Sequence, residues 1–178
     1  MKRIILLWPN KEPLESLKKE FTELFSEYAV LDNSKDFSNV KAAILFINAE
    51  DGPIEVAVDQ LIEMRKNRIQ NVFGFIYNSN KVSDSEILKL INQRTKELLN
   101  EYGYLGPEFA VYSDSKDSDQ FISFVRKNID NTSQMNFTLP KFTCRFCGYT
   151  DNKNFAICSS CRKKQKKSFF ASLFGKNK

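Results

Sequence analysis

The sequence predicts an α/β fold in which a five-stranded, mainly parallel, doubly wound sheet precedes a small C-terminal module. An unbroken apolar run at 42–47, closed by polar residues, glycine and proline, is typical of a strand buried on both faces. Helix-length amphipathic segments alternate with shorter apolar runs on both sides of it, as the crossovers of a parallel sheet require. All four cysteines lie between Cys144 and Cys161, which separates the module from the rest.

The first elements follow this alternation. Residues 2–8 are expected to form a strand, and Pro13 suits the first turn of a helix. The apolar residues of that helix share one face and are interpreted as core: Leu14, Leu17, Phe21, Leu24, Phe25 and Tyr28. A short strand at 28–31 ends at Asp32, and a polar loop then leads to the central strand.

Beyond the central strand, Gly52-Pro53 starts a second helix that ends in a basic turn at 65–68, which suits a helix C-terminus. Its helically spaced positions are Ile54, Val58, Leu61, Ile62 and Arg65. A fourth strand is expected at 72–77. Ser83 and Glu86 then resemble a capping box that opens a long helix, which Gly103 stops.

A fifth strand is expected at 109–112, followed by a helix marked by Phe121, Phe124, Val125 and Ile129. Right-handed crossovers and the short link between strands two and three favour the order 2-1-3-4-5. In such sheets a ligand binds at the carboxyl ends where the winding reverses, here between residues 8–10 and 48–51. The predicted units are a domain at 1–130, a linker at 131–140, a cysteine module at 141–161 and a basic amphipathic tail at 162–178.

Charge is distributed unevenly over these units. Residues 1–139 carry a net −4 and residues 140–178 a net +9, within a total of +5. The basic end is therefore expected to meet an acidic partner. Apolar runs are too short for a membrane span or a signal-peptide core, so we expect a cytoplasmic protein, with the tail as its one route to a membrane surface.

Three segments of the domain resemble the GTP-binding domain of translation elongation factor Tu and its relatives. They are residues 28–32, residues 43–53 with the Ala-x-Asp-Gly-Pro pattern, and residues 75–78. The likeness continues through the capped helix, with Glu97-Leu98-Leu99 and Tyr102, to about Ser113. It implies a fold of that type over roughly half of the chain.

The motifs that bind and hydrolyse GTP in that family are absent here. The first loop, 7–13, has no glycine, two prolines without an N–H and an acidic Glu12, so it lacks the glycine-rich backbone N–H cradle that holds phosphates in that family. Asp32 matches the Asp-x-x-Gly motif, but Lys35 replaces its glycine. Asn78 matches the base-reading Asn-Lys-x-Asp motif, but Lys81 replaces the acceptor that guanine needs. The resemblance therefore implies a pseudo-GTPase; a chance likeness among doubly wound domains is the alternative.

Other catalytic chemistry has little support in the sequence. Without histidine, the chain cannot form a Ser-His or Cys-His pair, and the family's water-orienting histidine is missing too. The acidic residues near the expected crevice, Asp32, Glu50 and Asp51, occupy ordinary loop and cap positions. A non-enzymatic role is expected, and a small-molecule enzyme is the least favoured alternative.

The cysteines have the spacing Cys-x2-Cys-x10-Cys-x2-Cys, through Cys144, Cys147, Cys158 and Cys161. Each pair can form a knuckle, Gly148 permits a positive φ, and four thiolates complete the tetrahedron of one structural Zn²⁺. The pattern also resembles the zinc ribbons appended to many bacterial proteins. Two disulfides or an iron–sulfur cluster are the alternatives.

The basic residues and phenylalanines of the C-terminal end are the expected contacts with a nucleic acid or another partner. They are Arg145, Lys153, Arg162, Lys163, Lys164, Lys166, Lys167, Phe169, Phe170 and Phe174. Phe146, Tyr149 and Phe155 could stack on bases, or Phe146 and Phe155 could instead form a small core over the knuckles. The tail's phenylalanines and Leu173 would share one helix face that a partner should cover.

These observations lead to the hypothesis of a non-catalytic adaptor that binds no GTP. The α/β domain would bind a protein, and the zinc ribbon with its tail would contact RNA, the ribosome or another acidic partner. An anionic membrane surface is the second hypothesis for the tail, and docking onto its own acidic domain is the third. Trp8, at the end of the first strand, is expected to fill the crevice that lacks its nucleotide.

Overall fold

The computed structural model describes residues 1–9, 15–34, 36–53, 55–104, 111–113, 118–130, 138–155 and 157–165. The chain divides into two compact units, Met1–Thr138 and Leu139–Lys178, and each is described by itself. None of the helices in these described ranges combines the length and the apolar composition needed to cross a bilayer.

The first unit is an α/β domain with a parallel sheet, which confirms the predicted class. Its strands are β1 (Arg3–Leu7), β2 (Ala29–Asp32), β3 (Val40–Asn48), β4 (Asn71–Tyr77) and β5 (Val111–Ser113). They lie in the order β2-β1-β3-β4-β5, and every neighbouring pair is parallel. The long apolar β3 lies between β1 and β4, with Ala42–Ile47 buried, so it is the central strand that the apolar run predicts.

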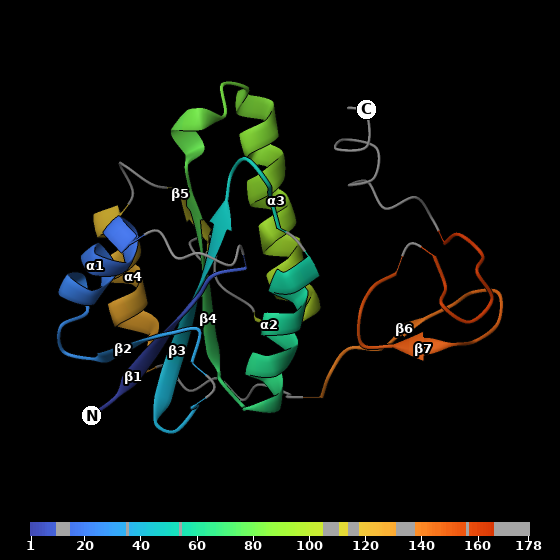
Figure 1. Ribbon diagram of the computed structural model, residues 1–178, viewed down its shortest axis with the longest axis horizontal. Helices are drawn as coiled ribbons and strands as arrows, with labels where there is room; N and C mark the ends of the chain where they lie inside the picture. The colour runs from blue at the N-terminus through green and yellow to red at the C-terminus, as the bar shows by residue number, and fades with distance from the viewer. Residues whose placement is uncertain are drawn as a thin grey trace. The chain divides into compact units, whose positions relative to one another are not determined.

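Two helices cover each face of the sheet (Figure 1). Helices α1 (Glu15–Leu24) and α4 (Ser118–Asn128) lie on one side, and α2 (Glu55–Lys66) and α3 (Ser85–Glu101) on the other. A short 3₁₀ turn, η1 (Ser79–Lys81), follows β4. Because successive residues of a strand point to opposite faces, the buried runs of β1, β3 and β4 contribute to two separate layers of core.

The face under α1 and α4 is dominated by aromatic side chains. Phe21 of α1 packs edge-on against Phe46 of β3 and Phe75 of β4, with ring centroids 5.0 and 5.1 Å away. Phe121 of α4 lies 5.1 Å from Phe75. All four rings are almost fully buried, so aromatic contacts join both helices to the two middle strands. The prediction that the α1 aromatics form core is confirmed for Phe21 and Phe25, which are fully buried.

One local prediction on the other face needs correction. The N-cap of α3 is Asp84, whose side chain accepts a hydrogen bond from the backbone N–H of Glu86 at 2.8 Å; Ser83 is not the cap. Arg65, one of the helically spaced positions of α2, is only 4% exposed and donates to the backbone oxygen of Thr138 at 2.7 Å. A carboxylate suits the positive end of a helix, and a guanidinium can be buried where it meets a carbonyl.

The connection from β2 to β3 passes across β1 in only seven residues, 33–39, and its described part contains no helix. Parallel crossovers usually need a dozen residues or more. This one can be short because β2 has four residues, about 13 Å in length at ~3.3 Å per residue. Asn33 and Asn39 adopt left-handed backbone conformations, with φ of 40° and 57°, which asparagine tolerates better than most residues.

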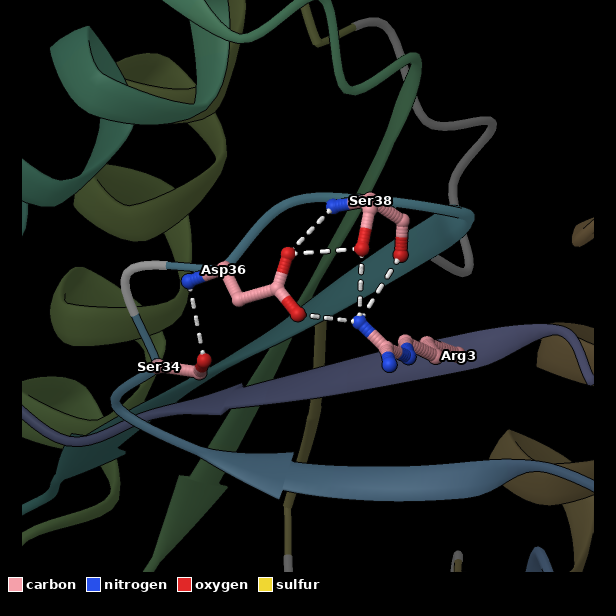
Figure 2. A network of polar contacts seen from close by, with 4 residues as sticks. All are labelled: Arg3, Ser34, Asp36 and Ser38. Atoms are coloured by element: carbon pink, nitrogen blue, oxygen red, sulfur yellow. Dashed lines mark hydrogen bonds and ion pairs between the residues drawn. The ribbon is translucent and has the colours of Figure 1, made fainter.

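A polar network holds this connection against the start of β1 (Figure 2). The Arg3 guanidinium donates to the Asp36 carboxylate and, at 2.8 Å, to the Ser38 hydroxyl oxygen. Asp36 also accepts from the backbone N–H and the hydroxyl of Ser38, at 3.0 and 2.6 Å. The hydrogen bonds from Ser38, followed by the one from Arg3, lower the pKa of Asp36 to about 2.

We predict that Asp36→Asn destabilises the first unit in a pH-dependent way. The folded-state pKa lies below the ordinary value of 3.8, so the ionised carboxylate stabilises the fold above about pH 4 and loses this effect toward pH 2. The difference in urea midpoint between wild type and variant should therefore be largest near neutral pH and shrink in acid. Trp8, the only tryptophan, reports unfolding of this unit.

Glu20→Gln, on the exposed part of α1, is the matched control and should show no comparable trend. A midpoint difference for Asp36→Asn that stayed constant from pH 7 to pH 2 would contradict the role given to this carboxylate.

Candidate functional site

Trp8 occupies the carboxyl ends of β1 and β3, where the sequence predicts a crevice. Its ring stacks on Phe46, with centroids 3.9 Å apart and planes at 9°, and it meets the edge of Tyr77 at 6.2 Å. The backbone N–H of Trp8 donates to Asn33 Oδ1 at 3.0 Å. Trp8 is 2% exposed, so the expectation that this ring is buried at the sheet edge is confirmed.

The polar residues beside Trp8 bond to one another. Asn78 Nδ2 donates to Asn48 Oδ1 at 3.2 Å, and Asn48 Nδ2 donates to Asp51 Oδ2 at 3.0 Å. Lys81 forms an ion pair with Glu50 at 3.4 Å. Asn78 matches the first residue of the base-reading motif and Lys81 replaces its acceptor, and here both residues make contacts within the domain. The polar groups at the carboxyl end of the sheet thus bond to other groups of the same domain.

The four cysteine thiols of the second unit converge. All four Sγ atoms lie within 4.8 Å of one another, and the pairs Cys144–Cys161 and Cys147–Cys158 are each 3.7 Å apart. Thiolates bound at about 2.3 Å to one tetrahedral ion lie about 3.8 Å apart, so the set fits a single metal ion. The cysteines are free thiols, not disulfides. A cluster of several irons would hold the sulfurs farther apart.

Two backbone turns of the same design present these thiols. In the first, Gly148 N donates to Cys144 O at 2.9 Å and Cys144 N donates to Tyr149 O at 2.7 Å. In the second, Arg162 N donates to Cys158 O at 2.9 Å and Cys158 N donates to Lys163 O at 3.1 Å. Each knuckle has a left-handed residue at the same place: Gly148 has a φ of 75° and Arg162 a φ of 58°.

Short antiparallel pairings extend both knuckles. Strands β6 (Phe142–Thr143) and β7 (Thr150–Asp151) flank the first, and a bridge between Ile157 and Lys164 flanks the second. The folded part of the unit therefore includes residues 162–165, which were predicted to belong to the tail.

The thiols differ strongly in pKa. Burial raises the pKa of Cys144, but hydrogen bonds from the backbone N–H groups of Phe146 and Cys147 outweigh it and lower the value to about 6. A backbone N–H at Lys163 lowers the pKa of Cys161, whereas burial and the neighbouring thiols raise it to about 11. Cys144 thus loses its proton easily, whereas Cys161 retains its proton among the neighbouring sulfurs. A divalent cation at their centre would favour the loss of all four protons.

Gln165 contributes to the site although its sequence position gave no sign of it. Its Nε2 donates to Cys144 Sγ at 3.3 Å and to the backbone oxygen of Lys163 at 3.1 Å, while its Oε1 accepts from Arg145 N at 3.3 Å. One amide therefore joins the two knuckles and one cysteine sulfur. A side-chain amide can donate and accept hydrogen bonds at once, which this position requires. Many exposed glutamines make no such contacts, so the residue type alone does not predict the role.

The predicted contact residues are only partly described. Arg145, Arg162, Lys163 and Lys164 are exposed on the cysteine unit, and Lys153 is half-buried. The others lie outside the described residues: Lys166, Lys167, Phe169, Phe170 and Phe174.

Phe155 and Phe146 differ in burial and in their contacts. Phe155 is half-buried and packs against Tyr149, with ring centroids 6.0 Å apart, as a small core would. Phe146 is 46% exposed, with Arg145 Cζ 4.6 Å and Lys163 Nζ 5.1 Å from its ring centroid.

We predict that Gly148→Ala weakens metal binding about fivefold, the equivalent of about 1 kcal/mol. A left-handed non-glycine residue costs ~1–2 kcal/mol, partly offset by the reduced entropy of the unfolded chain. No atom lies within 4 Å of the added Cβ, so the cost comes from the backbone alone. Competition with a chelator measures the affinity.

The converse change, Arg162→Gly, removes the left-handed side chain from the second knuckle and should leave affinity unchanged or raise it. If Arg162→Gly weakened binding as much as Gly148→Ala does, the two turns would not share the backbone constraint.

Comparison with known proteins identifies a fold. No protein-family model matches the chain. The apo form of translation elongation factor SelB from Methanococcus maripaludis is structurally similar, with a TM-score of 0.58 at 13% sequence identity. The match covers 79% of this chain and 37% of that one. The fold is therefore similar to part of an elongation factor of the type that the sequence resembles.

Proposed function

We propose that this protein is a nucleotide-independent adaptor related in fold to elongation-factor GTPases, with a zinc-held basic unit that contacts RNA or the ribosome. The observation that carries the proposal is that the domain's own side chains fill the carboxyl end of the sheet. Trp8 stacks on Phe46 where a doubly wound domain would receive its ligand, and Lys81 pairs with Glu50 where guanine would need an acceptor.

Catalysis is not part of the proposal because the sheet edge lacks the necessary groups. The sequence of the loop after β1 has no glycine, contains Pro9 and Pro13, and carries the acidic Glu12 where phosphates would have to be held. Asp32, the acidic residue that matches a GTPase motif, forms an ion pair with Lys18 at 2.9 Å. These features favour a domain that retains the GTPase fold as a binding surface.

The metal is proposed to be one structural Zn²⁺. Four thiolate ligands complete a tetrahedral shell and leave no position open for a substrate, and the 3.7 Å sulfur separations fit bonds of about 2.3 Å. Cys144, Cys147, Cys158 and Cys161 would hold the ion, whose role there is to keep the two knuckles together. Among residues 139–155 and 157–165, few apolar side chains are buried, so metal coordination would replace a hydrophobic core there.

The purified protein should contain one zinc ion per chain, measured by elemental analysis. Chelation should unfold the cysteine unit and leave the first unit folded, because the two are separate compact units. Helical circular dichroism and Trp8 fluorescence should then change little. Iron, or no metal in freshly reduced protein, would refute the zinc site; loss of the helical signal would refute the independence of the first unit.

The choice of RNA or the ribosome as partner rests on charge and on the fold comparison. Residues 140–178 carry a net +9, which four thiolates and one Zn²⁺ reduce to about +7. Such a basic segment attached to an acidic domain favours a polyanionic partner. Similarity to part of a translation factor makes the ribosome the first polyanion to test.

Sedimentation with purified ribosomes through a sucrose cushion tests this function. Full-length protein should co-sediment at low salt, with equal yield in GTP, in GDP or without nucleotide, and salt should weaken binding. The chain ending at Thr138 should remain in the supernatant. GTP up to about 100 μM should leave Trp8 fluorescence unchanged. Absence of ribosome or RNA binding, or a requirement for GTP, would count against the proposal.

A further inference from the structure

We infer that Phe146 is a stacking platform for an unpaired nucleic-acid base, with Arg145 and Lys163 positioned to hold the adjoining phosphates. This inference rests on the proposed function and specifies it further: the cysteine unit recognises single-stranded rather than duplex segments. It is carried by the contacts around one exposed ring.

The surroundings of Phe146 differ from those of a core residue. The residue is 46% exposed, yet Arg145 Cζ and Lys163 Nζ lie 4.6 and 5.1 Å from the ring centroid. Arg145 comes from the first knuckle and Lys163 follows the second, so both halves of the unit contribute to one surface. Both cations lie over the Phe146 ring, so a base that stacks on this ring would find the positive charge that its phosphate requires at the same place.

The geometry of this surface is tied to the metal site. Gln165 accepts from the backbone N–H of Arg145, donates to the backbone oxygen of Lys163, and donates to Cys144 Sγ. The backbones that carry both cations are therefore fixed relative to a metal ligand. A surface ordered before binding loses less entropy on association than a mobile one.

Charge complementarity favours a polyanion as the occupant. Between residues 139 and 165 there are six lysines and arginines and one acidic residue, Asp151. Insertion into a bilayer is less suitable, because Phe146 could enter the apolar layer only with two cations beside it, and desolvating charge is costly. Duplex RNA is less suitable because its bases already stack on each other and expose only their edges.

Fluorescence anisotropy with the zinc-loaded full chain tests the inference. The probes are a labelled, unstructured RNA of about 12 nucleotides, the DNA strand of the same sequence, and the RNA duplex. Titrations at about 50 to 200 mM salt give both the affinity and its salt dependence. The single strand should bind more tightly than the duplex.

Variants separate stacking from charge. Phe146→Leu should weaken single-strand binding about 5- to 150-fold with an unchanged salt slope, whereas Phe146→Trp should retain the affinity. Arg145→Gln and Lys163→Gln should each reduce the salt slope by about 0.7. Ile157→Ala is the matched control, since Ile157 is 52% exposed on the same unit, and it should have little effect. Zinc content verifies that each variant is folded.

The outcomes distinguish this inference from the proposed function. If duplex and single strand bind equally, or Phe146→Leu behaves like Ile157→Ala, the platform is refuted while an RNA-binding role stands. Tighter binding of DNA than RNA would support the platform and count against the ribosome. If no oligonucleotide binds at about 50 mM salt, both fail, and binding only to phosphatidylserine vesicles would assign the unit to membranes instead.

Discussion

The stack of Trp8 on Phe46 is the contact on which both the fold and the functional interpretation of the first unit depend. It joins the carboxyl ends of β1 and β3, and Phe46 continues the contact to Phe21 and Phe75. Trp8 therefore covers the carboxyl ends of these two strands and extends the aromatic core beneath α1 and α4. Replacing a buried Phe or Trp by Ala typically lowers the free energy of unfolding by about 3–5 kcal/mol, which sets the scale for the contribution of this stack.

The link between β2 and β3 is short for a parallel crossover. A link of seven residues crosses β1, its described positions contain no helix, and Arg3 contacts the loop through Asp36 and Ser38. A helix at that place would contribute apolar area to the core; here hydrogen bonds and two left-handed asparagines define the path. Most of these groups are solvent-exposed, so the network determines the course of the chain more than it determines overall stability.

The described part of the cysteine unit has few buried apolar side chains and is organised by local backbone hydrogen bonds. Its two knuckles repeat one hydrogen-bond pattern, and Gln165 joins them beside the sulfurs. Because Gln165 joins Cys144 to the backbones of Arg145 and Lys163, a change in the knuckles would also alter the positions of these two cations.

The sequence by itself determined the features that depend on local pattern. The apolar run at 42–47 predicted a buried central strand, helical spacing predicted the packing of Phe21 and Phe25, and cysteine spacing predicted the ligands that the fold brings together. These signals survive because backbone periodicity and knuckle geometry act over a few residues. The missing phosphate-loop residues were likewise readable from the sequence alone.

Only the tertiary structure decided the contacts between distant segments. The burial of Arg65 against Thr138, the pairing of Lys81 with Glu50, and the position of Gln165 at Cys144 join residues that are 73, 31 and 21 positions apart. No local pattern distinguishes such residues from solvated ones of the same type. Their roles follow from the carbonyl, carboxylate or sulfur that the fold places within hydrogen-bonding or ion-pairing distance; for the buried Arg65, such a partner is also what makes burial of the charge tolerable.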